Sequence, residues 1–286
     1  MLLWFAATAV VMLLAPAASA QQAQPTAPAY FVNISYIKAL PGQGAAYRTW
    51  MTTMSKKFYQ ELMSSEPSFV HWSCAQNLYR GMEQQDFDYA CVTVTVGDPL
   101  DTTRDMEPIY KKLGTTAVDY QAKLGAMRTV VGSELLRRMS GTSATVTGTT
   151  VEGNFRVTTE LKLSPGMMDE FNTRVTTLTL PLMQNLVTAG GNLKSWSMWV
   201  RLFPNGAATS YDVLGVTSHA TLASAVAGGN TNPNGGLEAF IKAHPDKSFA
   251  TYNNNGRDYA TQQQRMVSRV VALVERSAAA KTSQNP

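Results

Sequence analysis

The sequence contains few of the residues that bind metals or act as nucleophiles. Its 286 residues include three histidines and two cysteines, and no histidine has metal-ligand spacing to another histidine, a cysteine or a carboxylate cluster. The phosphate loop, G-x-G-x-x-G and G-x-S-x-G are also missing. These absences exclude the commonest hydrolase, nucleotide-binding and dehydrogenase classes, so we predict no metal and no cofactor. An enzyme whose substrate supplies the reactivity stays open.

Charged residues are few as well, at 15% of the chain against 44% apolar residues. This composition is typical of a folded protein with an ordinary core, and it excludes an intrinsically disordered chain. The net charge of +4 comes from 24 basic and 20 acidic residues, and the basic residues are scattered singly or in pairs. Because no basic stripe is interleaved with aromatic residues, we expect no nucleic-acid partner.

An apolar segment at the N-terminus predicts that the protein is exported. The apolar run is too short to span a bilayer with ease, and Ala18-Ser19-Ala20 after it fits a small-x-small cleavage site that would leave Gln21 first. We therefore interpret residues 1–20 as a signal peptide and residues 21–29 as a flexible tail. We expect a periplasmic or secreted protein with no membrane segment after cleavage. Because no Lys or Arg precedes the apolar run, an uncleaved anchor is the alternative.

The chain contains an internal repeat with a shift of 124 residues. Residues 36–42 (YIKALPG) resemble residues 160–166 (ELKLSPG), and a tryptophan follows the proline by 31 residues in both copies, at Trp72 and Trp196. A third, weaker match aligns Tyr89 with Tyr211. We predict one repeat at 30–139 and a second at 154–276, joined by a Ser/Thr/Gly-rich linker at 140–153 and followed by a tail at 277–286.

Each repeat predicts the order strand, helix, strand, strand, helix and a final apolar segment. The first strand, at 30–39, is rich in aromatic and β-branched residues and ends in a Pro-Gly turn. Apolar residues at spacings of three and four then predict a helix. The final segments, 127–139 and 266–274, fit either a strand or a helix. In the second repeat, Pro181 lies inside the predicted helix and should kink it or end it early.

This order of elements, with the K-x-x-P-G turn after the first strand and the tryptophan in the second, resembles the dimeric α/β-barrel superfamily. The resemblance implies an α+β fold in which two tandem ferredoxin-like repeats pack as an intrachain pseudo-dimeric α/β barrel. The superfamily includes cofactor-independent monooxygenases, haem-binding enzymes and proteins without an assigned activity, so it implies a fold more than a function. Each repeat could cover the bare sheet face of the other, with side chains or a pocket between them.

Strand alternation divides the residues of each strand between two faces. We expect the valine-rich face of the third strand to lie against the helices, and the face with Tyr89 and Cys91 to look into the space between the sheets. Trp72 and Cys74 of the neighbouring strand would share that inner face. A hairpin would then place Cys74 beside Cys91, either as a disulfide or as two buried free thiols.

Seven residues are candidates for ligand binding on the inner surface. They are the aromatic and sulphur-containing side chains expected there, with polar groups of the first strands: Asn33, Trp72, Tyr89, Arg156, Trp196, Met198 and Tyr211. Aromatic rings between the sheets would suit a small apolar or aromatic molecule with a hydroxyl or carbonyl group, and solid packing is the alternative. Arg156 and Glu160 share the polar face of their strand, which the pattern places in solvent, with a buried pair as the alternative.

Together these patterns predict an exported α/β-barrel protein of unassigned activity that binds a small apolar or aromatic molecule between its two sheets. One alternative is a cofactor-independent monooxygenase-like enzyme that uses four of the candidates, namely Asn33, Trp72, Tyr89 and Arg156. A second alternative is a haem-binding protein in which His71, the histidine inside a predicted strand, ligates the iron. Whether the protein is an enzyme, and its oligomeric state, stay open.

Overall fold

The computed structural model describes residues 28–79, 86–99, 101, 103–145, 151–206, 209–227, 235–250, 252 and 258–276. The predicted signal peptide, most of the predicted tail at 21–29 and the predicted tail at 277–286 lie outside these ranges. No helix in the described ranges has both the length and the hydropathy needed to cross a bilayer.

Eight strands of the described chain form one antiparallel sheet that closes into a barrel, in the order β1-β3-β2-β8-β5-β7-β6-β4. The strands are β1 (Tyr30–Ala39), β2 (Phe69–Tyr79), β3 (Tyr89–Val96), β4 (Arg128–Thr145), β5 (Phe155–Leu163), β6 (Leu193–Phe203), β7 (Val213–His219) and β8 (Ala260–Glu275). Each half of the chain supplies four neighbouring strands, β4-β1-β3-β2 and β8-β5-β7-β6. The pairs β2–β8 and β4–β6 join the two halves. The fold is therefore α+β.

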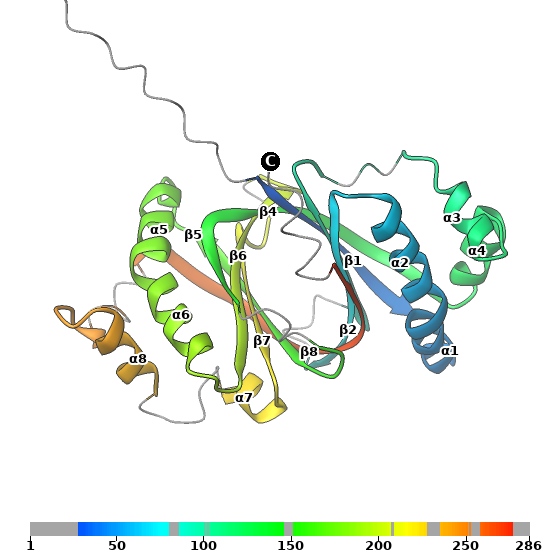
Figure 1. Ribbon diagram of the computed structural model, residues 1–286. Helices are drawn as coiled ribbons and strands as arrows, with labels where there is room; N and C mark the ends of the chain where they lie inside the picture. Colours follow the sequence, from blue (N-terminus) through cyan, green and yellow to red (C-terminus); the bar gives the residue numbers. More distant parts are fainter. Residues whose placement is uncertain are drawn as a thin grey trace, which may run out of the picture.

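The helices lie outside the barrel, those of the first half on one side and those of the second half on the other (Figure 1). In both halves the first helix is interrupted by a π-helical turn. The first half has α1 (Gly44–Trp50), π-helical η1 (Met51–Ser55), α2 (Lys56–Ser65), α3 (Glu107–Lys112) and α4 (Ala117–Gly125). The second half has α5 (Met168–Arg174), π-helical η2 (Val175–Thr179), α6 (Leu180–Thr188), α7 (Leu222–Ala227) and α8 (Gly235–Ala243).

Pro181 does not end the helix of the second half, contrary to one of the two expected outcomes. It lies in the first turn of α6, directly after the π-helical turn η2. Proline is tolerated there because the N–H that it lacks is not needed in the first turn. Since the first half has the π-helical turn η1 at the same place without a proline, the turn does not depend on Pro181.

Local geometry recurs at the 124-residue shift. Gly42 and Gly166 of the two Pro-Gly turns have φ of 75° and 78°, in the region that favours glycine. The pairing of β1 with β4 shifts register between residues 36 and 37, and that of β5 with β8 shifts between residues 160 and 161. These matches explain why the Pro-Gly turn was the clearest mark of the repeat in the sequence.

The face of β3 that packs against the helices carries Tyr89 and Cys91, so the expected assignment of its two faces is wrong. Tyr89 is buried in a cluster with Tyr47 and Met51 of the helices. The valines, such as Val92, pack instead inside the barrel. At β3 the small β-branched side chains fill the interior, where side chains of all the strands converge, whereas the ring of Tyr89 packs against the helix layer.

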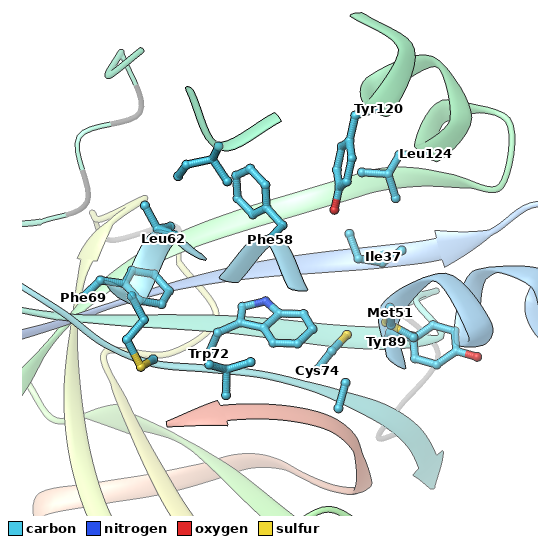
Figure 2. Packing of buried hydrophobic residues seen from close by; sticks show 14 of the residues in the cluster. Ile37, Met51, Phe58, Leu62, Phe69, Trp72, Cys74, Tyr89, Tyr120 and Leu124 are labelled. Carbon is cyan, nitrogen blue, oxygen red and sulfur yellow. The ribbon is translucent and has the colours of Figure 1, made fainter. Parts of the chain in front are cut away.

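Trp72 belongs to the same buried cluster as Tyr89, between the outer face of the sheet and the helices of the first half (Figure 2). Its indole stacks on the ring of Tyr59, with 4.4 Å between the ring centres. Cys74 and Cys91 lie directly opposite each other on β2 and β3 and form a disulfide. The sequence left open a disulfide or two buried free thiols, and the structure has the disulfide.

Strand β4 continues to Thr145, well into the segment predicted as a linker. Residues 143–145 pair with residues 195–197 of β6, so this end of β4 is held by a strand of the other half. The sequence could not indicate the partner, because Ser and Thr are equally common in linkers and at strand edges. The two ambiguous apolar segments, at 127–139 and 266–274, are parts of strands β4 and β8.

We expect replacement of Cys74 and Cys91 together by alanine to lower the free energy of unfolding by about 3 kcal/mol. The disulfide restricts the unfolded chain, and its removal gives that chain more conformations. Urea unfolding followed by circular dichroism measures the difference. A reducing agent should destabilise the wild type by a similar amount and leave the double variant unchanged. Equal stability of the oxidised and reduced wild type would contradict the expectation.

Candidate functional site

The barrel contains a cavity of about 260 Å³. One wall is apolar and comes from the adjacent strands β1 and β3. Its side chains are Val32, Ile34, Ala90, Val92 and Val94. They form cross-strand neighbours, with Ile34 opposite Val92 and Val32 opposite Val94. Because every second residue of a strand points inward, this pairing makes a continuous apolar surface on the side of the first half.

A row of polar side chains crosses the strands of the opposite wall. Asn77 of β2 lies opposite Ser268 of β8, and Ser268 lies opposite Arg156 of β5. On the other side of β5, Arg156 lies opposite Ser218 of β7, and Ser218 lies opposite Ser195 of β6. All five residues line the cavity. The cavity therefore has one apolar wall and one wall rich in hydrogen-bonding groups.

Arg156 is the cation in this row. Its Nη2 donates a hydrogen bond to Ser73 Oγ at 2.7 Å, and Nε2 of His71 lies 2.9 Å from the same oxygen. Nδ1 of His71 is in turn 3.8 Å from a carboxylate oxygen of Glu275. Loss of hydration inside the barrel lowers the pKa of Arg156 to about 10. The guanidinium therefore remains charged at neutral pH.

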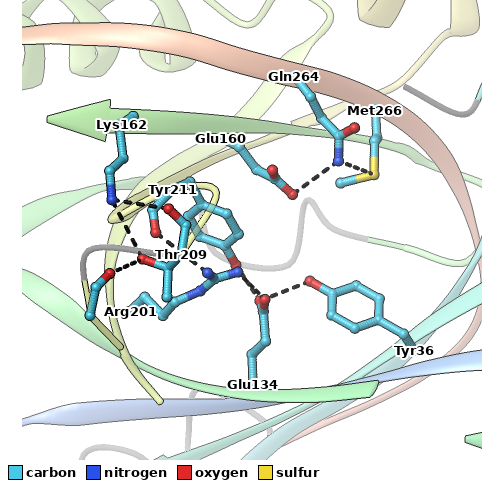
Figure 3. Close-up of polar contacts among 10 residues, drawn as sticks. Tyr36, Glu134, Glu160, Lys162, Arg201, Thr209, Tyr211, Gln264 and Met266 are labelled. Atoms are coloured by element: carbon cyan, nitrogen blue, oxygen red, sulfur yellow. Dashed lines mark hydrogen bonds and ion pairs between the residues drawn. The ribbon is translucent and has the colours of Figure 1, made fainter. Parts of the chain in front are cut away.

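A second polar cluster, centred on Glu134, fills another part of the barrel interior (Figure 3). The carboxylate accepts hydrogen bonds from the hydroxyl of Tyr36 at 2.9 Å, from the hydroxyl of Tyr211, and from Nη2 of Arg201. The guanidinium of Arg201 also lies 3.5 Å from the centre of the Tyr211 ring. The side chains of Arg201 and Glu134 are only 7% and 10% exposed, so this ion pair is buried.

Burial and the acidic neighbours determine how this cluster is protonated. Burial, reinforced by Glu134, raises the pKa values of Tyr36 and Tyr211 above the ordinary value for tyrosine. Burial lowers the pKa of Arg201, but Tyr211 and Glu134 outweigh that effect and raise it. At neutral pH both tyrosines therefore donate to a carboxylate that also neutralises Arg201.

The predicted site residues lie in several different places. Arg156 lines the cavity, and Tyr211 belongs to the Glu134 cluster in the barrel interior. Trp72 and Tyr89 face the helices of the first half, so the expectation that they look across the barrel is wrong. Asn33 points to the outer face as well, because Val32 and Ile34 on either side of it point inward.

Trp196 and Met198 belong to the core between the sheet and the helices of the second half. They line a second cavity of about 830 Å³ outside the barrel, with Phe171 and Val175 of the helix, and Trp196 also borders the interior cavity. Tyr252 lies at the edge of the second cavity, and its neighbours in the chain lie outside the described residues. The interior cavity is built mostly from the paired strands of the barrel, and we take it as the candidate site.

Tyr211 and Tyr89 were aligned with a shift of 122 residues, whereas the rest of the repeat has a shift of 124. At the constant shift Tyr211 corresponds to Phe87. Phe87 is also inside the barrel, where its ring lies 4.7 Å from that of Tyr36. The next residue in each half, Asp88 or Asp212, accepts a hydrogen bond from the backbone at the end of the first strand. A strictly constant shift would have found this correspondence from the sequence.

The polar face of β5 lies inside the barrel, so the expectation that it faces solvent is wrong. Glu160 is 2% exposed and accepts a hydrogen bond from Gln264 at 3.1 Å. Arg156 and Glu160 therefore have separate polar neighbours and do not form the pair that was the alternative. Glu134 and Arg201 were not candidates at all. A signal for Glu134 was its position as an isolated acid within an apolar strand segment.

No group of three or more metal-ligating side chains with suitable geometry occurs in the described ranges. Nε2 of His71 lies 2.9 Å from Ser73 Oγ in the barrel, so the imidazole has a hydrogen-bond partner within the protein.

No family model matches the sequence, and no curated protein matches it. Solved structures do match the fold. The "putative monooxygenase" of Fusobacterium nucleatum subsp. nucleatum has a TM-score of 0.52 at 10% identity, over 89% of this chain and 97% of that chain. A "putative monooxygenase" of Lactobacillus acidophilus NCFM has a TM-score of 0.51 at 8% identity, over 88% of this chain and 97% of that chain. At such identities the likeness is one of fold alone.

We expect Glu134→Ala to lower the free energy of unfolding by about 3–5 kcal/mol, because it leaves Arg201 buried without its carboxylate partner. Urea unfolding measures the change. Glu61→Ala is the control, since Glu61 pairs with Lys112 at 2.9 Å on the surface and its loss should cost less than about 1 kcal/mol. Adding Arg201→Met to Glu134→Ala should recover part of the loss. Equal effects of the two single substitutions would contradict the buried ion pair.

Proposed function

We propose that this chain, which has the fold of the dimeric α/β-barrel superfamily, binds a small apolar or aromatic molecule inside its barrel. The observation that carries the proposal is the interior cavity of about 260 Å³, with its apolar wall from β1 and β3. Small-molecule sites are mostly apolar clefts with a few polar groups that orient the ligand, and their volumes are roughly 300–1,000 Å³. The cavity lies near the lower limit, so the ligand is small.

Aromatic side chains at the border of the cavity support a ligand with a flat body. Trp199 lines the cavity, and its indole N–H donates to Ser197 at 2.8 Å, which holds the ring in place. Tyr36 and Phe87 line another part. Rings held by hydrogen bonds and packing present a rigid surface, and rigid surfaces lose little entropy on binding.

We also propose that the two halves are copies of one unit that pack as an intrachain pseudo-dimer. The matched strand orders, the π-helical turns and the two positive-φ glycines, all at one shift, support a duplication. A single unit would leave the inner face of its sheet bare, and two units in one chain cover each other.

A monooxygenase-like activity is not part of the proposal. Of the four residues that such an activity was expected to use, Asn33, Trp72 and Tyr89 are directed to the outer face of the sheet. Arg156 alone of the four lines the interior cavity.

We expect Val92→Phe to weaken binding of 2-naphthol by about tenfold or more, because the larger ring fills space next to the apolar wall. Isothermal titration calorimetry with the wild type and the variant measures the affinity. Val118→Phe is the matched control, since Val118 is 78% exposed on α4 and should leave the affinity unchanged. Unweakened binding to a folded Val92→Phe variant would contradict a site inside the barrel.

The proposal includes export with cleavage after Ala20. The disulfide between Cys74 and Cys91 supports it, because such bonds persist in oxidising compartments. We expect the full chain, expressed in an export-competent bacterium, to be recovered from the periplasm or medium with Gln21 as its first residue. Mass spectrometry of the intact protein measures this. Recovery of the uncleaved chain in the membrane fraction would favour the anchor instead.

A further inference from the structure

Arg156 is a cation in the barrel interior, and no carboxylate among the described residues forms an ion pair with it. In the part of the chain that the structure describes, its guanidinium donates to Ser73 at 2.7 Å and forms no ion pair. Arg201, elsewhere in the interior, is paired with Glu134. A charge moved out of water without an opposite charge lowers the stability of a fold. Arg156 is half-buried, and we expect its unpaired charge to cost the free protein stability that the paired Arg201 does not.

The fold itself does not require a cation at this position. At the 124-residue shift Arg156 corresponds to Val32, which is 4% exposed and packs in the apolar wall. The two residues occupy corresponding places on the first strand of each half, β1 and β5. A valine meets the pairing and packing requirements in the first half, so the guanidinium in the second half is not there for packing.

The groups around Arg156 add to its hydrogen-bonding capacity. Ser218 and Ser268, its two cross-strand neighbours, line the cavity beside it. The buried hydroxyl of Ser218 has no hydrogen-bond partner within the described ranges. Asn77, the next residue in the row, has an amide whose nitrogen and oxygen are buried and similarly unpaired there. Polar groups with unused capacity thus gather around one guanidinium, across the cavity from the apolar wall.

The other charged groups of the cavity favour an anion over a cation. Besides Arg156, the charged residues that line it are Arg138 and Glu275. Arg138 lies 3.6 Å from the centre of the Tyr30 ring, a neutral partner that leaves its charge in place. The side chain of Glu275 is 36% exposed and lies 3.8 Å from His71. Two cations and one partly solvated carboxylate line the cavity, while Glu160 and the Glu134–Arg201 pair lie in the barrel interior outside its lining. The lining of the cavity is therefore favourable for a negative group.

We propose that the ligand of the interior cavity is a small carboxylate, with its carboxylate group bound by Arg156 and its apolar body against the wall of β1 and β3. This inference rests on the proposed function and names the chemistry of the molecule bound. The planar guanidinium matches a carboxylate with two parallel hydrogen bonds, which lysine or a serine hydroxyl cannot provide. The hydroxyl of Ser218, a cross-strand neighbour of Arg156 that is unpaired among the described residues, is a further donor in the row.

The test compares 2-naphthoate with 2-naphthamide, which have nearly the same shape and differ in charge. We expect the wild type to bind 2-naphthoate at least about tenfold more tightly in isothermal titration calorimetry, because charge-assisted hydrogen bonds are the stronger ones. Arg156→Val, which introduces the residue of the corresponding position, should abolish this preference and leave the affinity for 2-naphthamide nearly unchanged. Arg156→Gln, a polar substitution without the charge, should do the same and serves if the valine variant does not fold.

Arg201→Met is the matched control, because it removes an interior arginine that has its carboxylate partner. We expect Arg201→Met to lower the melting temperature and to keep the preference for 2-naphthoate. Arg156→Val should leave the melting temperature unchanged or raise it, since it removes an uncompensated charge. A melting temperature that falls as far in Arg156→Val as in Arg201→Met would assign Arg156 a structural role and overturn the inference.

The outcomes separate this inference from the proposed function. If the wild type binds both compounds equally, or if Arg156→Val retains the preference, Arg156 does not bind the anionic group and the cavity remains a site for neutral molecules. If the wild type binds neither compound, the proposed function fails and the role of Arg156 fails with it.

Discussion

Two seams of backbone hydrogen bonds, β2 with β8 and β4 with β6, hold the halves of the described chain in one barrel. Without them each half would expose two sheet edges and one bare sheet face, and both are unstable in water. Two polar contacts of the interior bridge these seams. Glu134 and Arg201 lie on β4 and β6, and Ser73 and Arg156 reach each other from β2 and β5, on either side of β8. Closure of the barrel is therefore what creates the interior site.

The two faces of the sheet differ in the side chains they carry and in what they contact. In the first half the outer face carries Trp72, Tyr89 and the disulfide, and it packs against helices in a dense core (Figure 2). The inner face carries valines, serines, several aromatic rings such as Trp199 and Tyr36, and a few charged groups around a cavity. If the halves are copies, as we propose, their inner faces have diverged. Val32 and Tyr36 in one half correspond to Arg156 and Glu160 in the other. Two identical units would each supply the same wall, so they could not form a cavity with one apolar wall and one polar wall.

Much of the fold could be predicted because it depends on local signals. The order of elements follows from apolar spacing and turn residues, and the Pro-Gly turns follow from glycines at positive φ. The apposition of Cys74 and Cys91 follows from a single hairpin. Two of the seven candidate site residues, Arg156 and Tyr211, lie in the barrel interior, and Trp196 borders its cavity. The other four do not, because alternation divides a strand into two faces without saying which one is inside.

The sequence by itself determined the order of most elements, the two Pro-Gly turns and the two sets of side chains on each strand, since these depend on residues close together in the chain. Only the tertiary structure decided which set faces inward, where β4 ends, and which distant residues meet. Arg201 and Glu134 are 67 residues apart, and Arg156 and Ser73 are 83 apart. Contacts at such separations arise from closure of the barrel and the choice of partner strands, and no local pattern of residues encodes that choice.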